Sequence, residues 1–356
     1  MSRFLKGKFE KLNVYVPGEQ PQDMTYIKLN TNESPYPPSP EVLAAVSEAE
    51  VSRLNLYPDP EMKALKGIIA DKNGLKPENI FLSNGSDDIL NFAFMLYGSM
   101  GEKVYFPDIT YGFYRVFGDL HQSQCVEIPL TENFEINIED YFKKDGLIII
   151  ANPNAPTGRY LSLDKIQKII EENPDNIVLV DEAYIDFGGE SATGFIKKYD
   201  NLIVSQTFSK SRSMAGARLG FAFASEEIIR DFEKIKYSTN PYNINRLTAI
   251  AGCATMESEE YYREKCGEII KTREETTKKL EKEGFTVIPS KANFVFAKHN
   301  FVSGDYIYKK LKENGVLVRH YTEERIADYN RITIGTPEQM ETLYNKLKLI
   351  CERKGD

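Results

Sequence analysis

Two apolar stretches decide the fold of this chain: Leu147-Ile148-Ile149-Ile150 and Ile177-Val178-Leu179-Val180. Runs this continuous are typical of strands that are buried on both faces. Further short apolar runs, separated by helical patterns, lie at residues 80–82, 103–106, 202–204 and 219–223. Strands that alternate with helices predict an α/β domain, in which a mostly parallel sheet is covered by helices on both faces.

The rest of the chain has a different pattern. A long polar helix is expected at about residues 258–283, followed by hairpin-like strands at 286–288 and 293–296, a helix, strands at 316–318 and 331–334, and a closing helix. The first forty residues are rich in Pro, Asn and Gly, which predicts an extended arm. We therefore expect an arm (1–40) that packs on the small domain and the functional site, a large domain (41–255) and a smaller α+β domain (256–356).

Composition excludes several classes of protein. The 356 residues carry a formal net charge of −8, which argues against sequence-independent nucleic-acid binding because such binding needs a basic surface. The four cysteines and three histidines are scattered, with no spacing typical of a metal site or a disulfide framework. No stretch approaches the ~20 apolar residues of a membrane span, and the N-terminus has no leader pattern. We expect a soluble cytoplasmic protein without a metal.

Polar residues follow the predicted strands, where open α/β sheets place their ligand sites. After residues 80–82 the chain reads Ser83-Asn84-Gly85-Ser86-Asp87-Asp88 and then opens a helix. A Gly-Ser turn at a helix N-terminus offers unpaired N–H groups and a positive dipole, which suit a phosphate. The alternative is that Ser86 or Asp87 only caps the helix.

Two other strands end in residues with complementary chemistry. Asp181 follows the strand at 177–180, and a carboxylate there needs a cationic partner if it is buried. After 202–204 come Thr207, Ser209 and Lys210, and Arg218 opens the next strand. Together these side chains supply an anion site, an amine and a carboxylate. Pyridoxal 5′-phosphate needs this combination, for its phosphate, for an imine and for its pyridine nitrogen respectively.

Four motifs then occur in a fixed order: residues 152–158 (Asn-Pro-Asn-Ala-Pro-Thr-Gly), 181–184 (Asp-Glu-Ala-Tyr), 207–210 (Thr-Phe-Ser-Lys) and 215–220 (Ala-Gly-Ala-Arg-Leu-Gly). In these motifs the chain resembles the class I/II aminotransferases, pyridoxal-phosphate enzymes of fold type I, over essentially its whole length. The resemblance implies a large α/β/α domain that binds the cofactor and a smaller α+β domain.

The resemblance also implies roles for the matching residues. Lys210 would form the imine and shuttle a proton, Asp181 would pair with the pyridine nitrogen, and Tyr184 would bond the phenolic oxygen. Tyr111 resembles the aromatic residue that stacks on the ring, and Tyr57 resembles a tyrosine that reaches the phosphate from the other subunit of a homodimer with shared sites. The expected cofactor contacts are Gly85, Ser86, Asp87, Tyr111, Asn154, Asp181, Tyr184, Thr207, Ser209, Lys210, Arg218 and Tyr57.

One position departs from the family pattern. Asn is usual directly before Pro-Thr-Gly, where it bonds the phenolic oxygen, but this chain has Ala155. Two alternatives are open: Tyr184 carries that bond alone, or Asn154 shifts to help. We expect the loss of a donor to raise the pKa of the imine, because a phenolate without that donor holds the neighbouring proton more tightly.

The two ends of the chain resemble the histidinol-phosphate aminotransferases within this family. The resemblance lies in an arm with Tyr15-Val16-Pro17-Gly18 and Leu29–Pro35, and in Gly315–Arg319 and Arg331–Thr336. It implies that Tyr15, Asn32, Glu33, Arg319 and Arg331 bind the substrate, with both arginines on a substrate phosphate. Two arginines suit a dianion better than a single carboxylate does. His320 is expected to be a rim residue.

The implied reaction moves an amino group between L-histidinol phosphate and 2-oxoglutarate, within histidine biosynthesis. Two other enzymes stay open as alternatives: a lyase like threonine-phosphate decarboxylase and an aromatic amino-acid aminotransferase. A third reading, the regulatory module of a transcription factor, is disfavoured because Lys210 is intact and no basic extension is present.

Overall fold

A computed structural model describes residues 2–10, 12 and 14–352 of the chain. The larger of its two sheets has the strand order β2-β8-β7-β6-β5-β3-β4 within these residues. Its strands are β2 (Ile80–Ser83), β3 (Lys103–Pro107), β4 (Gln124–Ile128), β5 (Gly146–Ala151), β6 (Val178–Asp181), β7 (Leu202–Thr207) and β8 (Gly220–Phe223).

Strands β4, β3, β5, β6 and β7 pair in parallel, whereas β8 is antiparallel to both β7 and β2. The segment between β7 and β8 holds the loop with Lys210 and a short 3-10 helix rather than a crossover helix. The chain therefore returns in the opposite direction. The prediction of a mostly parallel sheet is confirmed.

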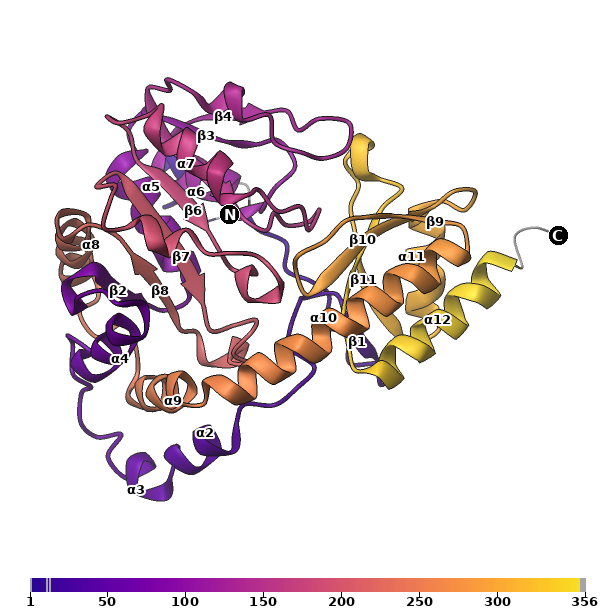
Figure 1. Cartoon of the computed structure of the whole chain (residues 1–356), viewed down its shortest axis with the longest axis horizontal. Coiled ribbons are helices and arrows are strands. Elements are labelled where there is room, and N and C mark those ends of the chain that lie inside the picture. The colour runs from indigo at the N-terminus through magenta and orange to yellow at the C-terminus, as the bar shows by residue number, and fades with distance from the viewer. Residues whose placement is uncertain (1, 11, 13, 353–356) are drawn as a thin grey trace.

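Alternate residues of the central strands pack into two separate cores. Val178 and Val180 belong to one core and Leu179 to the other, and none of the three side chains is exposed. The first core is covered by α4 (Lys63–Asn73), α7 (Leu163–Glu171) and α9 (Arg246–Glu257), and the second by α5 (Ser86–Tyr97), α6 (Phe113–His121) and α8 (Glu226–Thr239). The three α/β/α layers fill one side of Figure 1, and the predicted fold class is confirmed.

The smaller sheet has the order β1-β11-β12-β10-β9. Its strands are β1 (Ile27–Leu29), β9 (Phe285–Ile288), β10 (Phe294–His299), β11 (Val316–His320) and β12 (Asn330–Thr333). Strands β9 and β10 form the expected antiparallel hairpin. Helices α10 (Glu259–Lys282), α11 (Gly304–Glu313) and α12 (Pro337–Glu352) pack on this sheet, and α10 runs from the large part of the molecule to the small part (Figure 1).

The N-terminal segment joins the small part of the molecule. Strand β1, which was expected only as extended arm, pairs in parallel with β11 at the edge of the smaller sheet. Helices α1 (Gly7–Glu10), α2 (Pro40–Ala45) and α3 (Glu48–Val51) flank it in sequence. The remaining short elements are the 3-10 helices η1 (Pro77–Asn79), η2 (Ile138–Tyr141), η3 (Ile185–Phe187), η4 (Ala192–Phe195), η5 (Ala215–Ala217) and η6 (Glu324–Ile326).

The predicted domain boundary at residue 255 falls in the last turn of α9 and stays a prediction. Residues 1, 11, 13 and 353–356 of the predicted arm and small domain lie outside the described residues. Among the described helices, none is long and apolar enough to cross a membrane.

Candidate active site

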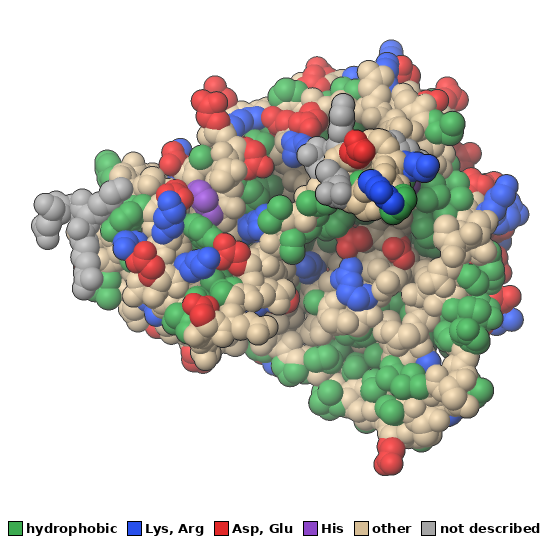
Figure 2. Space-filling model, turned by 180° about the vertical axis from the view of Figure 1, so that it is seen from behind, with side chains coloured by type: hydrophobic (Ala, Val, Ile, Leu, Met, Phe, Trp, Pro, Cys, Tyr) green, Lys and Arg blue, Asp and Glu red, His purple; other side chains and the backbone are tan. Residues whose placement is uncertain are grey.

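A cavity of about 370 Å³ opens where the carboxyl ends of β5, β6 and β7 meet the N-terminal segment and the smaller sheet. Figure 2 shows this face hollowed between the two parts, with basic and acidic side chains inside the hollow. The predicted site residues that line the cavity are Tyr15, Asn32, Glu33, Ser86, Asp87, Tyr111, Asp181, Tyr184, Thr207, Ser209, Lys210, Arg218, Arg319 and Arg331. The structure thus gathers residues that are widely separated in the sequence, from Tyr15 to Arg331.

Lys210 lies in the loop after β7, with its amine directed at the N-terminal segment. Its Nζ donates to the backbone oxygen of Thr31 over 3.2 Å. Burial, reinforced by the positive charge of Arg331, lowers the pKa of this amine to about 8. A lysine with this pKa is neutral far more often near neutral pH than an ordinary lysine, as a nucleophilic amine requires.

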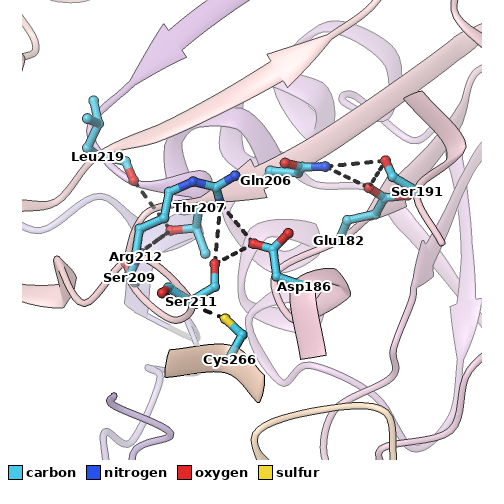
Figure 3. A network of polar contacts seen from close by, with 10 residues as sticks. All are labelled: Glu182, Asp186, Ser191, Gln206, Thr207, Ser209, Ser211, Arg212, Leu219 and Cys266. Atoms are coloured by element: carbon cyan, nitrogen blue, oxygen red, sulfur yellow. Dashed lines mark hydrogen bonds and ion pairs between the residues drawn. The ribbon is translucent and has the colours of Figure 1, made fainter. Parts of the chain in front are cut away.

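The loop that carries Lys210 is held by polar contacts on both sides (Figure 3). Before the lysine, the hydroxyl of Thr207 donates to Ser209 Oγ over 3.0 Å. After it, Ser211 donates a short hydrogen bond to Asp186, and Arg212 Nη1 lies 3.0 Å from the same carboxylate. These contacts fix the backbone on both sides of the amine.

A second network lies beside the first and holds the strand ends together (Figure 3). The carboxylate of Glu182 accepts from Ser191 Oγ at 2.5 Å, from the Ala192 N–H at 2.7 Å and from Gln206 Nε2 at 2.9 Å. Burial still raises the pKa of Glu182 to about 7. Glu182 does not line the cavity, so it supports β6 and β7 from behind.

Asp181 ends β6 at the floor of the cavity and has one oxygen without a partner. Its Oδ2 accepts from the hydroxyl of Tyr114 at 2.8 Å. Its Oδ1 is buried and has no hydrogen-bond partner among the described residues. Burial raises the pKa of this carboxyl to about 6. A buried carboxylate with a free oxygen fits a ligand N–H, above all a positively charged one.

Tyr114 is a supporting residue that sequence reasoning missed. It lies in the first turn of α6, whereas Tyr111 comes just before the N-cap residue Gly112. Its side chain is completely buried, and its ring meets that of Tyr111 at 5.7 Å and 89°. The signal in the sequence that could identify Tyr114 is its position, three residues after the predicted site residue Tyr111.

The start of α5 forms the polar end of the cavity. Arg218 Nη2 lies 3.0 Å from Asp87 Oδ2, and the hydroxyl of Tyr111 donates to Asp87 Oδ1 over 3.0 Å. Gly85 has φ +82°, and a Cβ there would lie 2.6 Å from Arg218 Nη2, so glycine lets the arginine approach. Gly85 is also the N-cap residue and no side chain caps the helix. The alternative in which Ser86 or Asp87 only caps α5 is therefore wrong.

Ala155 lines the cavity and Asn154 does not. The side-chain amide of Asn154 is used in the loop: its oxygen accepts from Thr110 Oγ1 at 2.7 Å, and its nitrogen donates to the Ile109 oxygen and to Thr157 Oγ1. The expectation that Asn154 contacts a cofactor or shifts to replace the missing asparagine is corrected, because its hydrogen bonds hold it in the surrounding loops.

Arg319 and Arg331 are directly paired residues on antiparallel β11 and β12. Arg319 donates to the backbone oxygens of Val16 and Pro17 at 3.2 and 3.4 Å, and Arg331 Nη2 donates to that of Asn30 at 2.9 Å. Arg331 Nε is buried without a partner in the described part of the chain. Neither guanidinium forms an ion pair with a described residue, so both are held by backbone carbonyls rather than by a carboxylate.

Of three further predicted site residues, two line the cavity and one does not. Tyr15 lies at the cavity, where its ring stacks on Phe113 at 4.3 Å. Glu33 also lines the cavity, but its carboxylate accepts from Lys28 and Thr31 at 2.8 and 2.9 Å. Tyr57 does not line the cavity: its side chain is 77% exposed and stacks on Tyr242.

The sequence matches the family model Aminotransferase class I and II over residues 24–347. The chain belongs to this family. The resemblance and the fold predicted from the sequence motifs are therefore confirmed.

Individual relatives of this aminotransferase cover nearly its whole length. It is 50% identical to the histidinol-phosphate aminotransferase of Brachyspira hyodysenteriae, over 99% of this chain and 100% of the relative. It is 46% identical to that of Clostridium acetobutylicum, over 98% of this chain and 99% of the relative.

Solved structures agree with the fold of this aminotransferase. A crystal structure of the histidinol-phosphate aminotransferase from Clostridium acetobutylicum is similar at a TM-score of 0.85 and 26% identity, covering 92% of this chain and 99% of that one. The enzyme of Sinorhizobium meliloti, in complex with pyridoxal-5′-phosphate, is similar at a TM-score of 0.89 and 22% identity, covering 99% of both chains.

The residues of the cavity fit pyridoxal 5′-phosphate. The orphaned Oδ1 of Asp181 can accept from a protonated ring nitrogen, and the amine of Lys210 can react with an aldehyde. The first turn of α5, with Thr207, Ser209 and Arg218, offers donors for a phosphate. The donor set therefore matches the three polar ends of the cofactor.

Proposed function

We propose that this aminotransferase transfers an amino group between L-histidinol phosphate and 2-oxoglutarate, giving imidazole acetol phosphate and L-glutamate, with pyridoxal 5′-phosphate as cofactor. Relatives that are 45–50% identical over 98–99% of this chain carry the name histidinol-phosphate aminotransferase. The observation that carries the proposal is the pair Arg319 and Arg331, neither of which forms an ion pair with a described residue, in the same cavity as Lys210.

The cofactor would be held at three points. Asp181 would hold the ring nitrogen, Tyr184 the phenolic oxygen, and the start of α5 with Arg218 the phosphate. When bound, pyridoxal 5′-phosphate supplies an electron sink for the charge that develops as the substrate Cα–H bond breaks. Tyr111, fixed by its hydrogen bond to Asp87, supplies an aromatic wall for the ring.

Lys210 is suited to carry a proton to and from the substrate carbon. A general base works best when its pKa lies near the operating pH, and burial together with Arg331 brings the pKa of Lys210 to about 8. The loop contacts of Thr207, Ser209 and Ser211 hold the amine in one place. Asp181 would stay ionised beside a protonated ring nitrogen, because a positive partner lowers the pKa of a buried carboxyl.

The arginine pair suits a substrate with a dianionic group. Both guanidiniums bond to neutral backbone carbonyls, which orient the arginines and leave their charge available. A phosphate monoester offers up to two negative charges and three acceptor oxygens to this pair. Glutamate could use the same pair through a carboxylate, so one site serves both half-reactions.

The active assembly that we propose is a homodimer in the cytoplasm. Tyr57 and the neighbouring Leu43, Leu54 and Leu56 are each at least half exposed, and hydrophobic side chains gather on the lower part of the face in Figure 2, over the segment with α2 and α3. A second copy would bury this surface and bring Tyr57 to the phosphate end of the partner site. The four cysteines are free thiols, which suits a reducing compartment.

A substrate panel tests the activity. Purified protein receives histidinol phosphate, threonine phosphate or phenylalanine, each with and without 2-oxoglutarate. We expect glutamate to form from histidinol phosphate and only when the oxo acid is present. Lys210→Ala is the matched control, and it should abolish this activity while the circular dichroism spectrum is retained.

Each other outcome overturns the proposal in a defined way. Release of CO₂ from threonine phosphate without an oxo acid assigns a lyase, and turnover of phenylalanine alone assigns an aromatic aminotransferase. Absence of all turnover, with no visible absorbance after addition of pyridoxal 5′-phosphate, would remove the enzyme assignment.

A further inference from the structure

A chain of hydrogen bonds runs from Thr333 on β12 through Asn32 to the hydroxyl of Tyr184. The backbone N–H of Asn32 donates to Thr333 Oγ1 over 3.0 Å, and Thr333 Oγ1 donates to Asn32 Oδ1 over 3.0 Å. Asn32 Nδ2 then donates to the Tyr184 hydroxyl oxygen over 2.9 Å. The three residues come from the N-terminal segment, the smaller sheet and the loop after β6.

The direction of each bond follows from the donors and acceptors that the structure assigns along this chain. A backbone N–H can only donate, so Thr333 accepts there and has one proton left to give. That proton goes to Asn32 Oδ1, which leaves the amide nitrogen of Asn32 facing Tyr184. Because the Tyr184 oxygen accepts from Asn32, its own proton points elsewhere, and Tyr184 lines the cavity.

Burial makes this arrangement rigid. Asn32 and Thr333 are 1% and 2% exposed, so neither can exchange its partner for bulk water without opening the structure. The backbone of Asn32 has φ +56° and its oxygen accepts from Asn293 Nδ2 at 3.0 Å, so the main chain is held as well. The ring of Tyr184 meets that of Phe294 at 5.1 Å and 89°, which fixes its plane.

We infer that Asn32 is a positioning residue that makes Tyr184 an obligatory hydrogen-bond donor to the phenolic oxygen of the bound cofactor. This inference rests on the proposed function. Asn32 lines the cavity, but both ends of its amide are used within the protein, so the expected substrate contact of this side chain is replaced by the role through Tyr184. Ala155, on the same cavity wall, has no polar side-chain atom that could supply a second donor.

Asn32→Asp tests the direction of the relay, because a carboxylate accepts where the amide donated. The Tyr184 proton then turns toward Asp and away from the cofactor. We expect the pKa read from the visible absorbance of the holoenzyme to rise by about one unit, since a lost hydrogen bond to an anionic oxygen changes a pKa by that order. The other charged groups that act on Tyr184, namely Arg331 on β12, Asp181 on β6, Asp87 on α5 and Lys210 after β7, stay unchanged.

Thr333 gives a second variant without a charge change, and it does not line the cavity. Thr333→Val removes the hydroxyl that orients the Asn32 amide, so we expect the same absorbance pKa to rise, by less than in Asn32→Asp. Thr333→Ser keeps the hydroxyl and is the matched control, with an unchanged pKa. Ala155→Asn in the Asn32→Asp background adds a donor to the cavity wall and should bring the pKa back down.

An absorbance pKa that stays within about 0.2 units of the wild-type value in both Asn32→Asp and Thr333→Val would overturn the inference. Equal shifts in Thr333→Ser and Thr333→Val would do the same, because they would indicate a packing effect. If Asn32→Asp does not fold, the comparison of Thr333→Val with Thr333→Ser alone decides whether the inference holds.

The cofactor-free protein separates this inference from the proposed function. If the chain shows no visible absorbance with pyridoxal 5′-phosphate, the proposed function fails. The relay is then read from ¹³C-labelled tyrosine, with the Tyr184 Cζ signal assigned by its loss in Tyr184→Phe. We expect a higher pKa for Tyr184 in Asn32→Asp than in the wild type, and an equal pKa in both proteins would contradict the relay.

Discussion

At the scale of single residues, the cavity contains charges that cost the folded protein free energy. Burial raises the pKa of Asp181 from the ordinary value of 3.8 to about 6. The folded carboxyl therefore binds its proton more tightly than the unfolded one does. The free energy of unfolding therefore falls as the pH rises from about 4 to about 6, and it stays at the lower value above pH 6. A cation paired with Asp181 would remove this loss.

Asp181→Asn should therefore stabilise the cofactor-free protein while removing its activity. We expect a gain of about 1–3 kcal/mol in unfolding free energy at pH 8, measured by denaturant unfolding. Turnover should fall by roughly a hundredfold or more, because the ring nitrogen loses its partner. The stability gain should vanish near pH 4, where wild-type Asp181 is already protonated. A variant that is no more stable at pH 8, or that keeps full turnover, would contradict this account.

Arg319 should distinguish the two substrates. Its side chain bonds only to backbone carbonyls among the described residues, so Arg319→Ala removes a charge without leaving a buried carboxylate unpaired. We expect the KM for histidinol phosphate to rise about 10- to 100-fold, the range for a lost charge-assisted hydrogen bond, and the KM for glutamate to rise much less. Arg319→Lys keeps the positive charge but loses the bidentate guanidinium, so its KM for histidinol phosphate should lie between those of the wild type and Arg319→Ala. Equal increases for both substrates would count against a phosphate-reading role.

At the scale of elements, the N-terminus of α5 depends on the absence of a side chain at Gly85. Gly85→Ala would place an L-residue at φ +82° and a methyl group 2.6 Å from Arg218 Nη2. We expect Arg218 to move and the Kd for pyridoxal 5′-phosphate to rise about tenfold, with a stability loss of about 1 kcal/mol. Absorbance titration and thermal unfolding measure the two effects.

Gly67→Ala is the matched control for that substitution. Gly67 lies within α4, and a Cβ there would meet nothing within 4 Å. Alanine is the better helix former by up to ~1 kcal/mol, so this variant should keep wild-type cofactor binding and be slightly more stable. If both variants weakened cofactor binding alike, the close approach of Gly85 to Arg218 would not be the cause.

At this scale, the elements that were predicted correctly are those whose hydrophobic pattern is compatible with only one kind of structure. The runs at 147–150 and 177–180 are buried on both faces, so hydrophobicity alone marks them as central strands. Strands β1 and β4 escaped prediction for different reasons. β1 has three residues and is a strand because β11 pairs with it, and β4 is a sheet-edge strand in which only Ile128 is buried. Pairing with a distant partner leaves no local signal in such segments.

At the scale of the whole molecule, the sequence analysis named residues with their own chemistry, which the structure places in one cavity, and it missed residues that support them. Lys210, Asp181 and Arg218 could be named because amine, carboxylate and guanidinium follow strand ends. The roles of Asn32, Thr333 and Tyr114 depend on contacts between segments up to 301 residues apart, which no local pattern contains. Asn154 was misplaced because its motif does not show that Thr110 and Thr157 occupy its amide.

The proposed sharing of sites between subunits has a test that uses two inactive proteins. Tyr57 is far more exposed than an aromatic core residue and lies outside the cavity of its own chain, while Lys210 lies inside it. If Tyr57 completes the partner's site, Lys210→Ala and Tyr57→Ala each inactivate or impair every site of their own homodimers. Mixing and refolding the two variants should then restore about a quarter of wild-type activity, because half of the randomly formed dimers contain one fully wild-type site. Lys210→Ala mixed with Asp181→Asn is the control: both residues come from one chain, so no hybrid contains an intact site. No recovery in the test mixture, despite hybrid dimers seen by native mass spectrometry, would contradict the sharing of sites through Tyr57. Equal recovery in the control would show that the gain does not come from Tyr57.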